Sequence, residues 1–574
     1  MEKRYAGCAN LSEERIKRLE QLRNSQSDES KERELLHIRP LVKRADRAFV
    51  VKYEPISEFI KEFEIDDYLL VTTPGVFKTI YEQLSGTYKV VYTKTSRIDE
   101  LENLPAMFKE TTESMHVDKG LTEQQRCIND GTVIDSYKFQ AVVCMGGGVA
   151  MDAGKYIAEK VGAPLYAIPT VLSVNAAFCY KAAVREPDQF EKGRYNVVYR
   201  FYGLPQAICI DLDVITNAKD FEIITGSANK EEKDAARIRW NMLRELNIAG
   251  AGDLLSILTA TYDWKLNSIA ARGLKVDGSE QYGMVSLEKP FSQEVCDGAN
   301  EVLDMLGEYA TEIRSGSREG AEFLARAYHW IAEQSWIMQH TMWESASEHG
   351  MFDCFENVAG TELTHGQVVA LSVFFMSLLQ DNQHERAVKM IQRLGIDISL
   401  AYLCAIDDNN YMIQPSTLCK CLAKLKEYIE QIDYRYTIIS ARPITEDWIL
   451  KSIDYYYNTV YGDLIDQYER RSKLYPELKQ GDRSDQEEIN ASERLRLEKI
   501  HDKLVSDLSK HREAFESCQK SYEAANERRV NIEKILANPK GRFMYKPSSE
   551  KQEIVDLYKE SLSDYLKCLE HLEK

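Results

Sequence analysis

The chain has 574 residues, 44% of them hydrophobic, and a formal net charge of −19 at pH 7. This length exceeds what one hydrophobic core supports, so two or three domains are expected. The acidic balance argues against nonspecific binding to nucleic acid or to an anionic membrane, because both require a basic protein surface.

Cysteine usage and the absence of apolar segments indicate the compartment. The twelve cysteines show no CxxC pair and no regular spacing, which favours reduced thiols over a disulfide framework. The N-terminus is charged and shows no signal peptide. No apolar run approaches the roughly 20 residues that span a bilayer. We therefore expect a cytoplasmic protein without a membrane span.

The first half of the chain alternates strand and helix patterns. Residues 1–45 are charged and helix-prone, and we expect a peripheral arm there. Residues 46–216 follow with apolar, β-rich runs and helical patterns between them. The expected strands are 67–72, 88–92, 141–145, 164–168 and 206–211, with helices at 76–84 and after 148. This alternation predicts a Rossmann-like α/β domain with a parallel sheet, whose ligands bind at the carboxyl ends of the strands.

The second half is helical. Residues 217–461 carry long patterns with a period of 3.6 residues and predict an all-α domain, with an exposed polar excursion at 226–234. Residues 462–574 predict a helical C-terminal extension whose narrow apolar seam is typical of a helical hairpin or coiled coil. We expect this extension to pack on the main body or on a second copy of the chain, in a homo-oligomer. A specific recognition module is the alternative.

A glycine-rich turn stands at the centre of the predicted α/β domain. The stretch 141–158 reads as a buried strand, the turn Gly146-Gly147-Gly148 and a helix. The free N–H groups and the dipole at such a helix start favour an anion. A glycine turn can also merely connect two elements. The spacing to Asp152 and Lys155 is more specific, and it differs from both the Gly-x-Gly-x-x-Gly fingerprint and the P-loop.

This spacing resembles the motif of the superfamily of iron-containing alcohol dehydrogenase, glycerol dehydrogenase and dehydroquinate synthase. In the helical part, Asp253, His349 and His365 resemble that superfamily's metal ligands in type, order and approximate spacing. One carboxylate and two imidazoles with an open position suit a catalytic cation. Each also has an ordinary explanation, since Asp253 can cap a helix and a lone histidine is usually a core residue. The resemblance implies one divalent metal: Zn²⁺ is expected, with Ni²⁺ or Fe²⁺ as alternatives.

The resemblance extends to the sn-glycerol-1-phosphate dehydrogenase branch. Gly250-Ala-Gly-Asp and Arg435-Tyr-Thr-Ile-Ile carry this likeness, and an Asp at the first ligand position favours a dehydrogenase over a cyclase. The resemblance implies an NAD(P)H-dependent reduction of dihydroxyacetone phosphate or a similar small phosphorylated ketone. The implied cofactor-binding residues are Gly146, Gly147, Gly148, Asp152, Lys155, Thr170 and Ser173. A sugar-phosphate cyclase and a non-catalytic scaffold that keeps the fold are the alternatives.

Two departures from the superfamily pattern concern specificity. The segment Val71-Thr-Thr-Pro-Gly75 lacks the carboxylate that would repel a 2′-phosphate, so NADPH is tolerated as well as NADH. Asn175 stands where the resemblance implies an aspartate touching the substrate, and we expect a catalytic role for it. Lys181 and Arg185 are candidates for a substrate phosphate, although solvation at the surface is the expected state of each.

Overall fold

The computed structural model describes residues 50–101, 139–189, 193–271, 291–400, 403, 415–432, 434–453, 455–456 and 458–460. The predicted arm 1–45 and extension 462–574 therefore lie outside the described residues. Described residues up to Ile398, with Leu403 and 429–442, form one compact unit; residues 415–428 and those from Pro443 onward belong to a second. The first unit contains both the sheet and the helices that follow it, so a domain boundary at 216/217 remains a prediction.

Six parallel strands form the central sheet, in the order β1-β8-β5-β4-β2-β3. Their bounds are β1 Val50–Lys52, β2 Asp67–Thr72, β3 Thr87–Tyr92, β4 Ala141–Gly146, β5 Leu165–Pro169 and β8 Ala207–Cys209. Every residue of β4 and β5 is buried. Such uninterrupted apolar strands are typical of parallel sheets that are covered on both faces. The predicted α/β fold with a parallel sheet is confirmed.

The winding of the sheet reverses between β2 and β4. From β2 the chain moves outward to β3, then returns to place β4 on the other side of β2 and continues outward to β5 and β8. In open parallel sheets, ligands bind at the carboxyl ends of the strands where this reversal occurs. Thr73 follows β2 there, and Gly147 follows β4.

Short helices connect the strands, and one longer helix follows the glycine turn. They are α3 Ile56–Glu62, α4 Pro74–Ile80, α5 Ile98–Leu101 and α7 Gly148–Val161, with a 3-10 turn, η2, at Tyr81–Gln83. The helix predicted at 76–84 thus ends at Ile80 and continues only as that turn. Helix α7 ends at Val161, and its C-cap Gly162 adopts the left-handed conformation (φ 66°) typical of that position.

A two-stranded antiparallel hairpin, which was not predicted, follows the sheet strand β5. It consists of β6 Lys181–Pro187 and β7 Tyr195–Phe201. Polar residues interrupt both strands, so neither has the apolar run of a sheet strand. Side chains attach the paired strands to the helical part: the Tyr199 hydroxyl donates a hydrogen bond to Asp353 (3.2 Å), and Arg185 is paired with Glu356.

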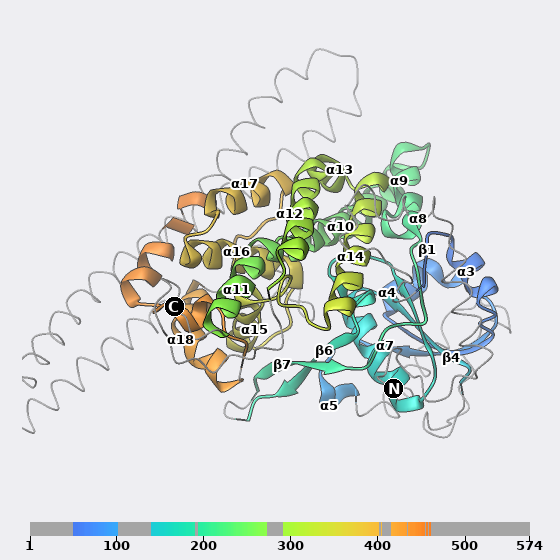
Figure 1. Ribbon diagram of the computed structural model, residues 1–574. Coiled ribbons are helices and arrows are strands. Elements are labelled where there is room, and N and C mark those ends of the chain that lie inside the picture. Colours follow the sequence, from blue (N-terminus) through green and yellow to red (C-terminus); the bar gives the residue numbers. More distant parts are fainter. Residues whose placement is uncertain are drawn as a thin grey trace, which may run out of the picture. The chain divides into compact units, whose positions relative to one another are not determined.

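The remaining described residues are mainly helical, which confirms the predicted all-α part (Figure 1). The helices of the first unit are α8 Leu212–Ile215, α9 Ala218–Thr225, α10 Lys230–Leu254, α11 Ser256–Ala271, α12 Gln293–Glu308, α13 Ala310–Ser315, α14 Arg318–Met338, α15 Ser347–Ala359, α16 His365–Gln380, α17 His384–Leu394 and α19 Ile438–Ala441. Most of α18 (Pro415–Gln431) belongs to the second unit. Within the described ranges, no helix is both long and apolar enough to cross a membrane.

The polar segment 226–234 is exposed as expected, but only its first half is a loop. Helix α10 begins at Lys230, where Asn229 and Glu232 form a capping box. The Glu232 N–H donates to the Asn229 side chain (3.0 Å), and the Glu232 carboxylate accepts from the Asn229 N–H (3.3 Å). This reciprocal pair satisfies two backbone donors that the first turn leaves unpaired.

Candidate active site

A cavity of about 980 Å³ connects the sheet with the helices of the first unit. At one end it is lined by Thr73, Gly147 and Gly148, at the carboxyl ends of β2 and β4. At the other end it is lined by Asp253, His349 and His365, from α10, α15 and α16. The glycine turn and the residues that resemble metal ligands, predicted separately from the sequence, therefore open onto one space.

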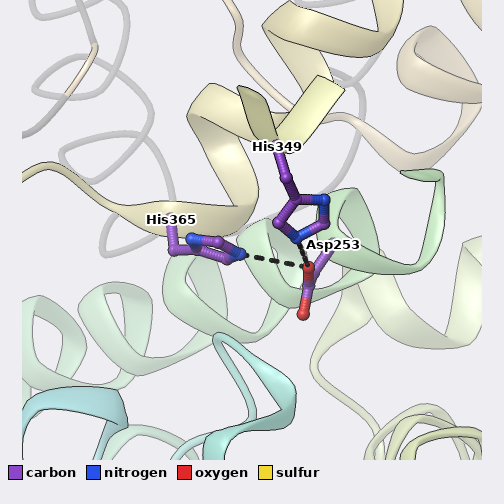
Figure 2. A group of neighbouring side chains, drawn as sticks. All are labelled: Asp253, His349 and His365. Atoms are coloured by element: carbon purple, nitrogen blue, oxygen red, sulfur yellow. Dashed lines mark hydrogen bonds and ion pairs between the residues drawn. The ribbon is translucent and has the colours of Figure 1, made fainter. Parts of the chain in front are cut away.

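The side chains of Asp253, His349 and His365 converge at one end of this cavity (Figure 2). Both imidazoles turn Nε2 toward the same carboxylate oxygen, Asp253 Oδ1, at 3.2 Å from His365 and 3.5 Å from His349. One ligand atom from each residue lies within 4.8 Å of the other two. Tetrahedral zinc with bonds of about 2.0–2.1 Å separates its ligand atoms by about 3.3 Å. The donor set and its spacing therefore fit a divalent cation.

Close contact between α10 and α16 brings Asp253 and His365 together. A Cβ atom on Gly252 would stand 2.1 Å from the Gly366 carbonyl oxygen, and one on Gly366 would stand 2.0 Å from the Ala249 carbonyl oxygen. Any other residue at either position would push the helices apart. Asp253 lies in the last turn of α10 rather than at a helix start, so the capping explanation for it is wrong.

A buried carboxylate orients His349. Glu348 Oε1 lies 2.9 Å from His349 Nδ1, and Glu348 itself is fully buried. The Ala346 N–H donates to Glu348 Oε1 (2.6 Å), and the Thr259 hydroxyl donates to Glu348 Oε2 (2.7 Å). A carboxylate on the far nitrogen fixes the tautomer and the ring orientation of a metal-binding histidine. This arrangement leaves His349 Nε2 facing the cavity.

The electrostatics of the cluster suit a cation. Burial alone would raise the pKa of Asp253, but the adjacent His365 and His349 lower it overall. Burial alone would lower the pKa of His349, but hydrogen bonds with Asp253 and Glu348 raise it to about 10. Burial also lowers the pKa of His365. The two carboxylates thus hold a positive charge between them, as a proton on His349 or, in its place, a metal ion.

The loop after β5 reaches the cluster through Asn175, in the 3-10 turn η6 (Asn175–Ala177). The Asn175 backbone N–H donates to Asp253 Oδ2 (3.2 Å), and its side-chain Nδ2 donates to Glu344 Oε2 (3.4 Å). Asn175 lines the cavity. The backbone N–H therefore holds the Asp253 oxygen that does not face the histidines, which leaves Oδ1 toward the cluster.

The other end of the cavity has the features of an anion site at a helix start. Gly147 is the N-cap of α7, and Gly148, Val149 and Ala150 line the cavity behind it. Gly146, the last residue of β4, has a φ of 148°, which a side chain would disfavour. Thr170 and Ser173 also line the cavity. The unpaired N–H groups at this helix start favour a phosphate.

Asp152 and Lys155 are placed differently from each other. Asp152 lines the cavity, and burial raises the pKa of its carboxyl. Lys155 is almost fully buried, and its ammonium donates to the carbonyl oxygens of Ala176 (2.7 Å) and Lys181 (2.6 Å). Its Nζ lies 3.7 Å from the Asp152 carboxylate. These contacts give Lys155 a positioning role: it fixes the loop that carries Asn175.

The two phosphate candidates also differ. Arg185 is buried and forms a bidentate pair with Glu356, and it also donates to Ser96 Oγ (2.7 Å). The expectation that Arg185 is solvated is wrong, because these partners occupy its guanidinium. Lys181 is half-buried and lines the cavity, as does Arg435, which donates to the Ser345 carbonyl oxygen (2.6 Å).

Two carboxylates of this site carried no role in the sequence prediction. Glu348 directly precedes the predicted ligand His349, and this adjacency was a weak indication in the sequence that the two side chains pair. Glu344 had none, because its place on the cavity wall depends on the turn between α14 and α15 meeting the loop after β5.

Comparison with known proteins points to the dehydrogenase family that the sequence motifs resemble. Residues 54–218 match the family described as iron-containing alcohol dehydrogenase. The chain is 26% identical over 339 residues to glycerol-1-phosphate dehydrogenase [NAD(P)+] of Aeropyrum pernix, covering 57% of this chain and 80% of that protein. It is 21% identical to the enzyme of the same name from Sulfurisphaera tokodaii, covering 68% and 89%. A glycerol dehydrogenase of Schizosaccharomyces pombe is 39% identical over 89 residues, or 15% and 18% of the two chains.

Solved structures are also similar to this chain. The crystal structure of glycerol dehydrogenase from Schizosaccharomyces pombe matches with a TM-score of 0.43 and 17% identity, covering 71% of this chain and 88% of that one. The resemblance to the iron-containing alcohol dehydrogenase and glycerol dehydrogenase family is confirmed by the sequence matches. They support an oxidoreductase of the alcohol or polyol dehydrogenase class that is linked to NAD(P).

Proposed function

We propose that this chain is a metal-dependent, NAD(P)H-linked dehydrogenase that reduces dihydroxyacetone phosphate to glycerol 1-phosphate. One observation carries the proposal: the Asp253, His349 and His365 cluster opens onto the same cavity as the glycine turn of α7. A nucleotide on that turn and a cation on that cluster would both face one small substrate. The names of the Aeropyrum and Sulfurisphaera relatives suggest this substrate.

Each part of the cavity has a role in this proposal. The N–H groups at the start of α7, with Thr170 and Ser173, hold the nucleotide phosphates. Asp253, His349 and His365 hold the divalent cation, which we propose to be zinc. When bound, a divalent cation stabilises negative charge on the substrate oxygen, and the nicotinamide supplies the hydride. Lys181 and Arg435, on the wall near the cluster, are the cationic groups that we propose for the substrate phosphate.

The proposal is tested by following NADH and NADPH absorbance with dihydroxyacetone phosphate, after loading the protein with Zn²⁺, Ni²⁺ or Fe²⁺. We expect stoichiometric cofactor oxidation with at least one metal, at one equivalent of metal per chain. The variant His365→Ala should lose turnover together with bound metal. Full activity of this variant would contradict the assigned site.

Other outcomes identify the alternatives. Conversion of a phosphorylated sugar without net change in NADH would indicate a cyclase, which regenerates its cofactor. Metal far below one equivalent per chain, with no turnover, would indicate a scaffold that keeps only the fold. A homo-oligomer and a location in the cytoplasm remain predictions, which sedimentation of the purified protein and imaging of the tagged chain would check.

A further inference from the structure

Glu344 places a buried carboxyl on the wall of the proposed active site. It lies in the turn between α14 and α15, is only 6% exposed, and lines the cavity. The Ser335 hydroxyl donates to Glu344 Oε1 (2.6 Å), and Asn175 Nδ2 donates to Oε2 (3.4 Å). Both carboxyl oxygens are thus held in place, from α14 on one side and from the loop after β5 on the other.

One residue, Asn175, links Glu344 to the cation cluster by hydrogen bonds. Asn175, which donates to Glu344 through its side chain, also donates to Asp253 Oδ2 through its backbone N–H (3.2 Å). Burial raises the pKa of Glu344 to about 7, and the hydrogen bond from Ser335 opposes this shift. Charged groups that act on Glu344 include Asp253, His349 and Lys181, from α10, α15 and β6. Two hydrogen bonds through Asn175 thus link Glu344 to Asp253, and both side chains line the same cavity.

None of the roles proposed above uses this carboxyl. Burial is costly for a carboxyl, and an apolar side chain would fill the wall without that cost. The hydrogen bond at Oε2 is long, and a carboxylate oxygen accepts more than one hydrogen bond. Oε2 therefore retains capacity for a donor in the cavity. A substrate hydroxyl is such a donor.

We infer that Glu344 accepts a hydrogen bond from the hydroxyl group on the carbon next to the reacting carbonyl, and so selects α-hydroxyketones over simple ketones. Ser335 and Asn175 hold the carboxyl in the position that receives this hydroxyl. This inference rests on the proposed function, and it names the part of the substrate that the metal, nucleotide and phosphate sites leave unrecognised.

The test compares two phosphorylated ketones that differ in this hydroxyl alone: dihydroxyacetone phosphate and hydroxyacetone phosphate. The assays are run at pH 8, above the pKa of about 7 to which burial raises Glu344, so that the carboxyl is ionised. A hydrogen bond to a charged acceptor corresponds to roughly 10- to 100-fold in affinity. We expect the wild-type kcat/KM to favour dihydroxyacetone phosphate by about that factor. Glu344→Met keeps the side-chain length without an acceptor, and should bring the ratio near one. Glu344→Gln keeps an uncharged acceptor and should give an intermediate ratio.

Control measurements distinguish loss of hydroxyl recognition from a general disruption of the site. Glu333→Gln removes another buried carboxyl, on α14 two residues before Ser335, and should leave the ratio unchanged. Metal content and NADH binding are measured on every variant. If Glu344→Met fails to bind metal, the inference is tested by the ratio of kcat/KM values of Glu344→Gln alone. An unchanged preference in a Glu344 variant that binds metal and NADH overturns the inference. Absence of wild-type activity with both ketones instead overturns the proposed function.

Discussion

The carbonyl oxygen of Gly366 lies where the side chain of any other residue at position 252 would begin: a Cβ atom on Gly252 would be 2.1 Å away from it. This contact joins α10 to α16 one residue before Asp253 and one residue after His365. Asp253 and His365 therefore approach to 3.2 Å only because positions 252 and 366 carry no side chain.

Gly252→Ala should separate the two helices. In an open helix interior, Gly→Ala stabilises by up to about 1 kcal/mol, whereas overpacking destabilises by about 1–3 kcal/mol or more. At position 252 we expect net destabilisation in urea unfolding, and less bound metal by elemental analysis. Gly307→Ala in α12 is the control, because a Cβ there meets nothing within 4 Å. Equal effects at both positions would contradict the role of the contact.

Gly147→Val should weaken nucleotide binding and leave the metal in place. A Cβ on Gly147 would already stand 3.1 Å from a methyl group of Val171, and the added methyl groups would enter the space proposed for the phosphates. We expect the NADH dissociation constant, from fluorescence titration, to rise at least about tenfold, equivalent to about 1.4 kcal/mol. Loss of metal in the same variant would show that the two ends of the cavity are not separable in this way.

The buried pair of Arg185 and Glu356 should stabilise the hairpin only as a pair. Breaking a buried ion pair from one side costs about 3–5 kcal/mol, because it leaves an uncompensated charge. Arg185→Met and Glu356→Gln should therefore each lower the free energy of unfolding by an amount of that order. The double variant should lose less than the sum of the single variants. Additive losses in urea unfolding would mean that the two side chains stabilise the protein independently.

Asp263 should make stability depend on pH. Burial, with the nearby Glu348, raises the pKa of Asp263 to about 7, although its oxygens accept from the Ser347 and Ile438 N–H groups. The carboxyl in the unfolded chain has a pKa near 3.9. From about pH 4 to 7 the folded state retains a proton that the unfolded state has lost. This contribution to stability is complete below about pH 4 and is lost as the pH rises through 7.

Urea unfolding at pH 5, 6, 7 and 8 measures this effect. Asp263→Asn cannot titrate, so its free energy of unfolding should fall less between pH 5 and 8 than that of the wild type. Between pH 5 and 8 the wild type should lose a few kcal/mol more than the variant, at about 1.4 kcal/mol per pH unit up to the folded-state pKa. The variant should also be less stable at pH 5, because an amide cannot accept from both N–H groups. Parallel pH profiles would place the titration elsewhere.

Continuous apolar strands were predictable because they are buried on both faces. Residues 67–72 and 141–145 appear as β2 and β4 with little change at their ends. The hairpin β6–β7 could not be recognised from its own residues. Its position depends on partners 154 and 171 residues away in the chain, through Tyr199 with Asp353 and Arg185 with Glu356.

The site was predictable in its residue types and not in its geometry. Asp253, His349 and His365 were identified through resemblance, since no spacing along the chain brings three helices to one point. Their convergence depends on glycine contacts between α10 and α16 and on Glu348 behind His349. Glu344 was missed because nothing in its neighbourhood along the sequence indicates the loop that it meets.

The ammonium of Lys155 joins the helix of the glycine turn to the loop of Asn175 through the carbonyl oxygens of Ala176 and Lys181. A nucleotide that tightens the start of α7 would therefore also restrain the peptide that donates to Asp253. The consequence is mechanical: a single buried ammonium transmits any displacement of α7 to the loop that contacts Asp253.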